Sequence, residues 1–303
     1  MKFVLDAEQR MFGETLRRLL ADAGTAKIAR AWAAGDAGPG RALWASVAEA
    51  GVFAVAVPEE FGGAGRLPVE LVVAAEELGR AAAPGPYVET LAAAELLGES
   101  PWLPRIAEGE AIVSLAVPHA LDADVADLVL TADKVERKAG EALASLDPAR
   151  RLFRVEGASG GGAGFTDFGV LLCAAQQVGI GQALLEVSVE YARTRQQFGR
   201  PIGEYQAIKH HLASAMVELE FARPLLYGAA LSYGTPDFAR DVSAAKVAAS
   251  EASYGLAKTA LQVHGAIGYT DEYDPSLWIR KARALYSAWG SVAEHRARVI
   301  AAL

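Results

Sequence analysis

Cysteine is nearly absent from this 303-residue chain, since Cys173 is the only one. A single cysteine excludes an internal disulfide and any zinc site built from cysteine pairs, and it is typical of a reducing compartment. Long apolar runs are missing as well, because no uninterrupted run reaches the roughly 18–20 residues of a membrane helix. The opening segment MKFVLDAEQRM carries Asp6, Glu8 and Arg10 where a signal peptide needs apolar residues. We therefore expect a cytoplasmic protein with no membrane span.

Positive charge is also scarce. The chain has 29 Lys and Arg against 37 Asp and Glu, so its formal net charge is −8. This balance argues against binding to a phosphate backbone, and we expect no nucleic-acid partner. The adjacent His210 and His211 point in different directions on a helix, so they form no metal pair. No metal site is predicted.

The first third of the chain has the pattern of amphipathic helices. After Asp6, a predicted N-cap, the residues Phe12, Leu16 and Leu19 recur at helical spacing. Gly51 is a predicted helix stop, and the segment 52–68 is a loop punctuated by proline and glycine. Further helices are predicted before residue 83 and from about 87 to 97. Residues 1–110 are therefore predicted to form an N-terminal helical domain.

The pattern changes near residue 111. Short β-branched segments predict strands within 111–118, 127–137 and 150–157. A glycine-rich linker follows at 157–164. Residues 111–165 are therefore a reduced β middle segment, which can form only a small sheet that leans on its neighbours.

Helices return in residues 166–303. Four long ones are predicted, at about 168–196, 203–232, 237–263 and 275–302. Their short connections favour an antiparallel four-helix bundle. The predicted fold class is mainly α.

Two polar, glycine-containing turns stand out in this last part. The first is RQQFGRP, from Arg195 to Pro201, and the second is QVHGAIGY, from Gln262 to Tyr269. Local physics alone favours an ordinary helix end for the first and an inter-helix loop for the second. A ligand surface is the other interpretation, because glycines allow close backbone approach and glutamine both donates and accepts hydrogen bonds.

Several segments together resemble the acyl-CoA dehydrogenase family along nearly the whole chain. VAEAGVFAVAVPEEFGGAG and ELVVAAEELGRAAAPGP are similar to the family's N-terminal helical domain. RQQFGRPIGEYQAIKHHLA resembles its Arg-x-x-Phe-Gly…Gln-Ala segment, and QVHGAIGYTDEY resembles its Gln-x-x-Gly-Gly-x-Gly-Tyr turn. The resemblance implies a helical domain, a β domain and a C-terminal four-helix bundle, usually in a tetramer with tightly bound FAD.

In this family the two turns contact the FAD of the neighbouring subunit. The resemblance therefore implies that Arg195 pairs with pyrophosphate or adenine-side groups and that Phe198 packs on the cofactor. Gln262, Gly265 and Ala266 would meet the pyrophosphate. The cofactor-binding residues that the resemblance implies are Arg195, Gln197, Phe198, Gln206, Gln262, Gly265 and Ala266.

The chain departs from the family where catalysis needs a carboxylate. The family removes a proton from the acyl-CoA with a glutamate, but the matching element reads ALYSAWGSV, with Trp289 at the glutamate position. A second known place for the base, on the second long helix, has no carboxylate between Glu220 and Asp237. The arginine that approaches CoA is replaced by Val170. The segments that normally flank the flavin ring have no counterpart in 111–165.

The lost parts serve a subunit's own site, whereas the retained turns serve the partner's site. We therefore expect no catalytic residue in this chain and infer a subunit that completes the FAD site of a full-length sister chain. The partner would bind most of the acyl-CoA. Such α2β2 members act on steroid side-chain CoA thioesters, and the steroid assignment rests on that resemblance. One alternative is a self-sufficient homo-oligomer with a relocated base, Glu294 or Asp237, and another is a flavin-free helical interaction protein.

Overall fold

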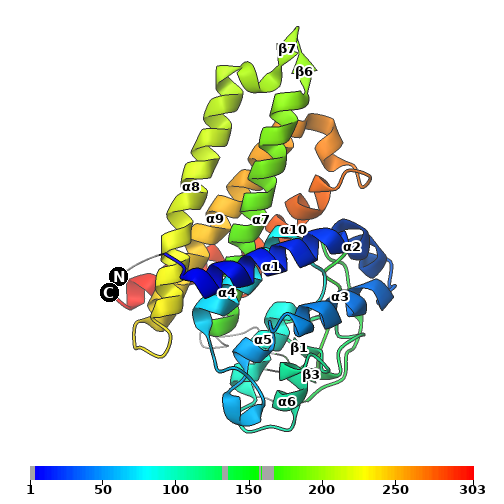
Figure 1. The fold of residues 1–303 in the computed structure, drawn as a ribbon, viewed down its shortest axis with the longest axis vertical. Helices are drawn as coiled ribbons and strands as arrows, with labels where there is room; N and C mark the ends of the chain where they lie inside the picture. The colour runs from blue at the N-terminus through cyan, green and yellow to red at the C-terminus, as the bar shows by residue number, and fades with distance from the viewer. Residues whose placement is uncertain (1–3, 132–135, 157, 159–166) are drawn as a thin grey trace.

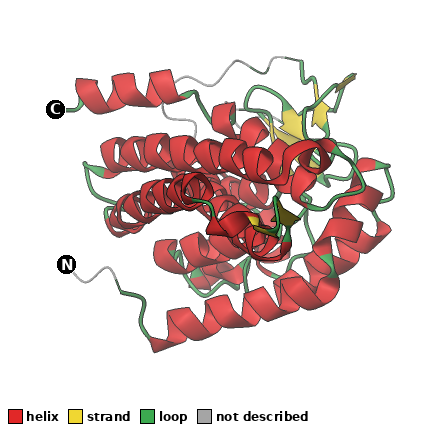
Figure 2. Ribbon diagram, turned by 90° about the horizontal axis from the view of Figure 1, so that it is seen from above, coloured by secondary structure: helices red, strands yellow, loops and turns green. Residues whose placement is uncertain are grey.

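The structure is a computed structural model that describes residues 4–131, 136–156, 158 and 167–303. The glycine-rich linker predicted at 157–164 lies outside these residues, except for Ala158. Helices make up most of the described chain, and the short strands of residues 113–153 gather at one side (Figure 2). The mainly α fold class is confirmed.

Six helices build the N-terminal part. They are α1 (Ala7–Ala23), α2 (Thr25–Ala33), α3 (Gly38–Glu49), α4 (Pro68–Arg80), α5 (Tyr87–Leu96) and α6 (Trp102–Ala107). Asp6 caps α1 as predicted, since its side chain accepts from the Gln9 amide and the Gln9 side chain returns a bond to the Asp6 amide. Gly24, with φ 67°, ends α1 and starts α2. The short helices α2 and α6 were not predicted as separate elements.

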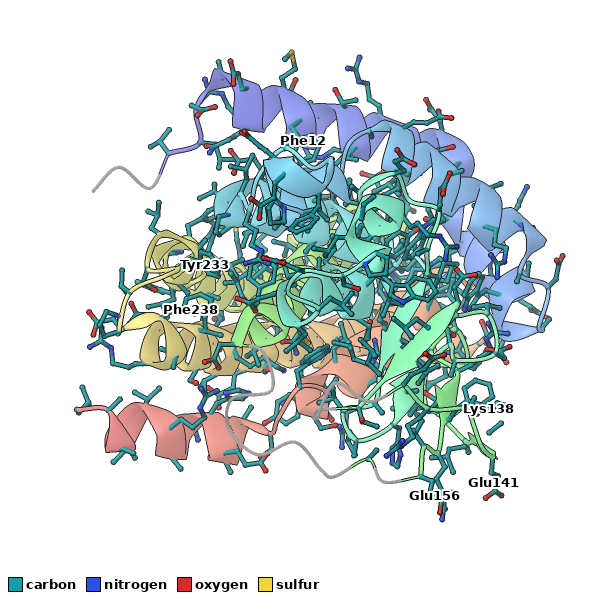
Figure 3. All side chains as sticks on the ribbon, turned by 90° about the horizontal axis from the view of Figure 1, so that it is seen from below. Phe12, Lys138, Glu141, Glu156, Tyr233 and Phe238 are labelled. Carbon is teal, nitrogen blue, oxygen red and sulfur yellow. The ribbon has the colours of Figure 1, made fainter. Side chains whose placement is uncertain are left out.

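The middle segment forms two small sheets rather than one. Strand β1 (Val113–Leu115) pairs in parallel with β3 (Leu128–Leu130). The other three strands are antiparallel in the order β2, β5, β4, and their bounds are Ala120–Leu121, Leu152–Phe153 and Ala142–Leu143. Strands of two or three residues cannot hold a wide sheet together. Lys138, Glu141 and Glu156 project from the outer edge of this segment (Figure 3).

Buried polar contacts attach the middle segment to the helices. The Trp32 indole donates to the Asp122 carboxylate at 2.9 Å, and Arg151 pairs with the same carboxylate at 3.2 Å. Lys281 pairs with buried Asp147 at 2.9 Å. Desolvation raises the pKa of Asp122 to about 6, although Trp32 and Arg151 both oppose that rise. The segment therefore does lean on its neighbours, as predicted.

The C-terminal part is an antiparallel bundle of long helices. Figure 1 shows α7 (Asp167–Thr194) rising to a hairpin, α8 (Gln206–Leu231) descending and α9 (Phe238–His264) rising again. At the α8–α9 turn Tyr233 and Phe238 meet edge to face, with ring centroids 5.2 Å apart (Figure 3).

The prediction of one long helix at 275–302 is wrong. The structure has α10 (Pro275–Ser287) and α11 (Val292–Ala301) instead. The break falls at Trp289 and Gly290, whose φ angles are 60° and 101°. A helix needs φ near −63°, so two successive residues of positive φ end it.

One contiguous core joins all three parts of the chain. Helix α7 lies at its centre, packed by α4, α9, α8 and α10. Its length and composition would allow it to cross a membrane, but 89% of that apolar window is buried inside the protein, as expected for a core helix. The domain boundaries at 110 and 165 remain predictions.

Candidate functional site

The two predicted cofactor turns lie at the same end of the bundle. The chain leaves α7 at Thr194 and forms a hairpin of β6 (Gln196–Gln197) and β7 (Arg200–Pro201), which tops the molecule in Figure 1. The second turn starts where α9 ends, as the 3-10 helix Gly265–Tyr269. Tyr191, one turn before Arg195, contacts His264, with ring centroids 4.5 Å apart. This contact joins the bases of the two turns.

The hairpin displays an aromatic ring to solvent. Phe198 and Gly199 occupy its two turn positions with φ angles of 52° and 82°, which is the sign that a tight two-residue hairpin requires. Positive φ suits glycine but costs another residue about 1–2 kcal/mol. The Phe198 ring is 93% exposed. Burial within this chain therefore does not explain why phenylalanine stands there.

Tyr205 holds the hairpin in place. Its hydroxyl donates to the Gln197 carbonyl at 3.1 Å. The Arg200 guanidinium stacks over its ring at 4.2 Å, and the Phe198 ring meets it edge-on at 6.5 Å. The turn is thus ordered by its own contacts while Phe198 stays uncovered.

All seven residues predicted to contact the cofactor are exposed on this chain. Gln206 opens α8 beneath the hairpin, and Gln262 lies in the last turn of α9. Among the described residues Arg195 forms no ion pair. The structure therefore brings the predicted residues to one end of the bundle, where a cation, several amides and an aromatic ring face outward.

Gly265 adopts a backbone conformation that other residues avoid, with φ 66° and ψ −143°. Apart from its neighbours in the chain, none of the described residues has an atom within 4 Å of the point where a Cβ would stand, either here or at Gly199. Both turns therefore present open backbone surface. Cation, amides, bare backbone and an exposed ring are the groups that bind a pyrophosphate and an aromatic base. The residues present thus fit an aromatic dinucleotide such as FAD.

His264 supports the second turn from inside the protein. It is buried at the end of α9, between Tyr191 and Tyr273. Its Nδ1 lies 2.8 Å from the Ala260 carbonyl and donates to it, because a carbonyl only accepts. Burial lowers the pKa of the ring, so the neutral form supports the second turn. Its Nε2 has no hydrogen-bond partner among the described residues.

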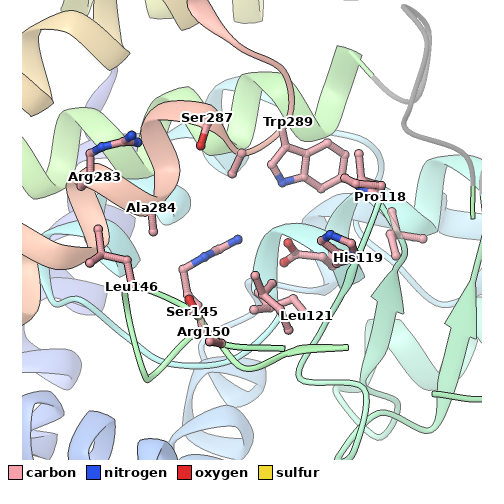
Figure 4. Close-up of a pocket in the computed structure, with 16 residues that line it drawn as sticks. Pro118, His119, Leu121, Ser145, Leu146, Arg150, Arg283, Ala284, Ser287 and Trp289 are labelled. Carbon is pink, nitrogen blue, oxygen red and sulfur yellow. The ribbon is translucent and has the colours of Figure 1, made fainter. Parts of the chain in front are cut away.

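Trp289 lies outside these turns and lines a separate cavity. Its side chain is 6% exposed and lines a cavity of about 390 Å³ between α5, the middle segment and the end of α10 (Figure 4). The backbone stays in the left-handed region because His295 Nε2 lies 2.8 Å from the Trp289 carbonyl. Gly290 then lets the chain turn into α11.

Glu89 shares this cavity and was missed by the sequence prediction. It is 4% exposed on α5, and the Trp289 side chain hydrogen-bonds to it. Desolvation raises the pKa of its carboxyl, while the positive charge of Arg150 partly offsets the rise. A signal was available in the sequence, because Glu89 is the one charged residue in the run YVETLAAA at 87–94. A carboxylate in such a run is expected to be buried only for a specific reason, and the structure buries all eight of these residues.

The two alternative bases do not lie in the cavity. Glu294 belongs to a capping box at the start of α11, where bonds with Ser291 lower the pKa of its carboxyl. Asp237 is exposed before α9 and pairs with Arg240 at 3.0 Å. Val170 is buried in α7, and its hydrocarbon side chain carries no charge for a ligand.

Comparison with known proteins places these features in context. Residues 6–110 match the model of the acyl-CoA dehydrogenase N-terminal domain, and residues 164–303 match that of the acyl-CoA dehydrogenase C-terminal domain. The chain is 35% identical to the acyl-CoA dehydrogenase IpdE2 of Mycobacterium tuberculosis, over 91% of each chain.

Solved structures share the fold. A chain of the ChsE4–ChsE5 complex from Mycobacterium tuberculosis matches with a TM-score of 0.84 at 23% identity, covering 99% of this chain and 98% of that one. A chain of the Tcur3481–Tcur3483 steroid ACAD matches with a TM-score of 0.84 at 22% identity, covering 97% of each. The two matched domains, the relative that spans the chain and the retained turns lead to one conclusion: this protein belongs to the acyl-CoA dehydrogenase family, whose members are FAD-dependent.

Proposed function

We propose that this chain is the non-catalytic subunit of a heteromeric acyl-CoA dehydrogenase and completes the FAD site of a full-length sister chain. One observation carries the proposal. Every residue predicted to contact the cofactor faces outward at one end of the bundle, whereas Trp289, which the resemblance aligns with the family's base, is buried in the chain's own cavity.

The exposed turns would bind the dinucleotide half of the cofactor. Arg195 supplies a charge-assisted contact to the pyrophosphate, and Gln262 with the backbone of Gly265 and Ala266 supplies uncharged ones. Phe198 offers its uncovered ring for stacking. Gln197 and Gln206 would add further hydrogen-bonding amides around the cofactor. Bound there, the cofactor would supply the hydride acceptor for the substrate's β-carbon.

The sister chain would contribute the base and most of the acyl-CoA contacts. The Trp289 indole nitrogen is a donor only, so it cannot remove an α-proton from a thioester. Of the carboxylates considered, Glu294 and Asp237 are both engaged outside the cavity. The names of two fold neighbours, a ChsE4–ChsE5 complex and a steroid ACAD, support a two-chain assembly and a steroid side-chain CoA thioester as substrate.

An exposed apolar stripe on α8 also supports a partner. Val217, Phe221 and Leu225 follow each other at intervals of four, so they share one face of the helix. The Phe221 side chain is 72% exposed. A contiguous apolar face of this kind is typical of a surface that another chain covers.

A second candidate is a self-sufficient homo-oligomer that uses Glu89 in place of the missing glutamate. The observation in its favour is that this buried carboxyl, with a raised pKa, shares the cavity with Trp289. Flavin content and turnover of the chain purified alone separate the two candidates, since the second requires a yellow, active product.

Arg195 provides the site-specific test. Arg195→Ala in the reconstituted complex should lower the flavin-to-protein ratio and the turnover together, because the pyrophosphate loses its charged partner. Arg193→Ala is the matched control, since Arg193 is an exposed arginine two positions earlier. Equal flavin content in both variants would contradict the assigned role of Arg195.

A further inference from the structure

The cavity beside Trp289 has the form of a small-molecule site. Its volume of about 390 Å³ falls within the range of ligand pockets. Leu115, Leu121 and Trp289 are buried and form an apolar inner wall, whereas the exposed His119 and Arg283 line the opening. A compact apolar molecule would find both an enclosed wall and an entrance.

One buried polar atom in the cavity has no partner. The Oε2 atom of Glu89 makes no hydrogen bond with the residues that the structure describes. Leaving such an atom without a hydrogen bond is unfavourable, because its desolvation is not compensated. Because the Trp289 side chain and the Glu89 amide already bond to this carboxyl, the free oxygen remains available to a molecule inside the cavity.

A guanidinium reaches into the same space. Figure 4 shows the Arg150 side chain extending from its loop into the cavity toward the side where Trp289 lies. Within the described part of the chain, Arg150 forms no ion pair. Its positive charge lowers the pKa of Glu89 through space, without a direct contact. A planar guanidinium with free donors is suited to a carboxylate.

We propose that this cavity binds a small apolar carboxylic acid, whose carboxylate lies between the Arg150 guanidinium and the Glu89 carboxyl. Burial favours the neutral form of Glu89, so its free oxygen can carry a proton and donate to the ligand. The apolar body of the ligand packs against Leu115, Leu121 and Trp289. The site lies on elements other than the cofactor turns, so it does not depend on the FAD assignment.

Calorimetric titration of the purified complex with cyclohexanecarboxylate tests the proposal, with cyclohexanecarboxamide as the matched neutral probe. The acid should bind and the amide should bind at least about tenfold more weakly, which corresponds to about 1.4 kcal/mol. No binding of the acid at millimolar concentration, or equal binding of both probes, would overturn the proposal.

Two variants locate the binding. Arg150→Met should weaken binding of the acid about tenfold or more, whereas Arg105→Met, at an exposed arginine of α6 outside the cavity, should leave it unchanged. Ala284→Leu narrows the cavity from α10 without removing a charge and should also weaken binding. If neither cavity variant changes the affinity, the site is wrong.

The coenzyme A thioester of the same acid serves as the last probe. It lacks the free carboxylate, so it should bind this cavity more weakly than the acid. Tighter binding of the thioester that is lost in Arg150→Met would show an acyl-CoA pocket instead and would overturn the proposal. Flavin content is measured in every sample, so failure of this site is distinguishable from failure of the proposed function.

Discussion

At the scale of single residues, Phe198 combines backbone strain with exposure. The φ of 52° disfavours phenylalanine, and the exposed ring gains little from its own chain. Residues in such strained positions persist at sites of function more often than elsewhere. A stacking partner outside this chain would account for the choice, and Arg195 and Gln197 lie on the same hairpin.

The variant Phe198→Gly separates the effect of the backbone strain on stability from the effect of the exposed ring on flavin binding. Glycine relieves the strain but loosens the unfolded chain, so the free energy of unfolding should stay within about 1 kcal/mol of the original value. The flavin content of the complex should nevertheless fall, because the ring is lost. Phe198→Tyr is the control that keeps the ring. Unchanged flavin content in Phe198→Gly, measured by absorbance, would show that the Phe198 ring does not contact the cofactor.

Glu89 should make the stability of the fold depend on pH. Burial raises the pKa of its carboxyl above 4.5, although Arg150, Lys281 and the bond from Trp289 oppose that rise. The folded chain thus keeps a proton that the unfolded chain releases. This contribution to stability is full below the unfolded pKa and is lost as pH rises through the folded pKa.

The matching variant is Glu89→Gln, which keeps the shape and the acceptor for Trp289. Its melting temperature should fall less than that of the original chain between about pH 5 and pH 8, because it has no carboxyl to ionise. Scanning calorimetry at several pH values provides the comparison. Parallel curves for the two proteins would mean that Glu89 is ionised in both the folded and unfolded states.

At the scale of elements, glycines set the contact between α4 and α7. A Cβ on Gly179 would lie 1.9 Å from the Glu76 carbonyl oxygen, and one on Gly79 would lie 2.2 Å from the Gln176 carbonyl oxygen. The two helices therefore approach backbone to backbone. This contact fixes the N-terminal helices against the bundle. Helix α5 belongs to the same part of the chain, so the contact also helps to place Glu89 beside Trp289.

Gly179→Ala should lower the free energy of unfolding by about 1–3 kcal/mol, because the helices must separate to admit the methyl group. Gly255→Ala is the control within α9, since a Cβ there would approach only the end of the flexible Glu218 side chain, at 3.1 Å. That control should be neutral or gain up to about 1 kcal/mol from helix propensity. Urea unfolding distinguishes them, and equal midpoints would contradict the close contact.

The long helices and their caps were predictable because apolar periodicity, Asp6 and the glycine stops are local signals. The break between α10 and α11 was missed, although Gly290 and the Ser291–Glu294 capping box are local signals for it. The segment ALYSAWGSV contains no proline, and its Trp289 disfavours the conformation that it adopts. His295 and the cavity stabilise that conformation, and both lie outside the local window. The two turns predicted to contact the cofactor stood out by their motifs, but their shared position at one end of the bundle was visible only in the fold.

At the scale of the whole molecule, two regions divide the chemistry. One end of the bundle presents exposed groups suited to a dinucleotide, and a separate cavity near the middle segment is lined by Trp289 and Glu89. The short segment 111–165 holds only two small sheets among its described residues. A molecule built this way would need a second chain to form a complete flavin site, and its exposed α8 stripe offers a surface for one.

The most direct measurement compares this chain expressed alone with the same chain co-expressed with its sister subunit. Flavin absorbance and acyl-CoA oxidation are recorded for each purified product. The account predicts a colourless, inactive protein alone and a yellow, active complex that turns colourless when Arg195 is replaced by alanine. A yellow and fully active oligomer made only of this chain would contradict it.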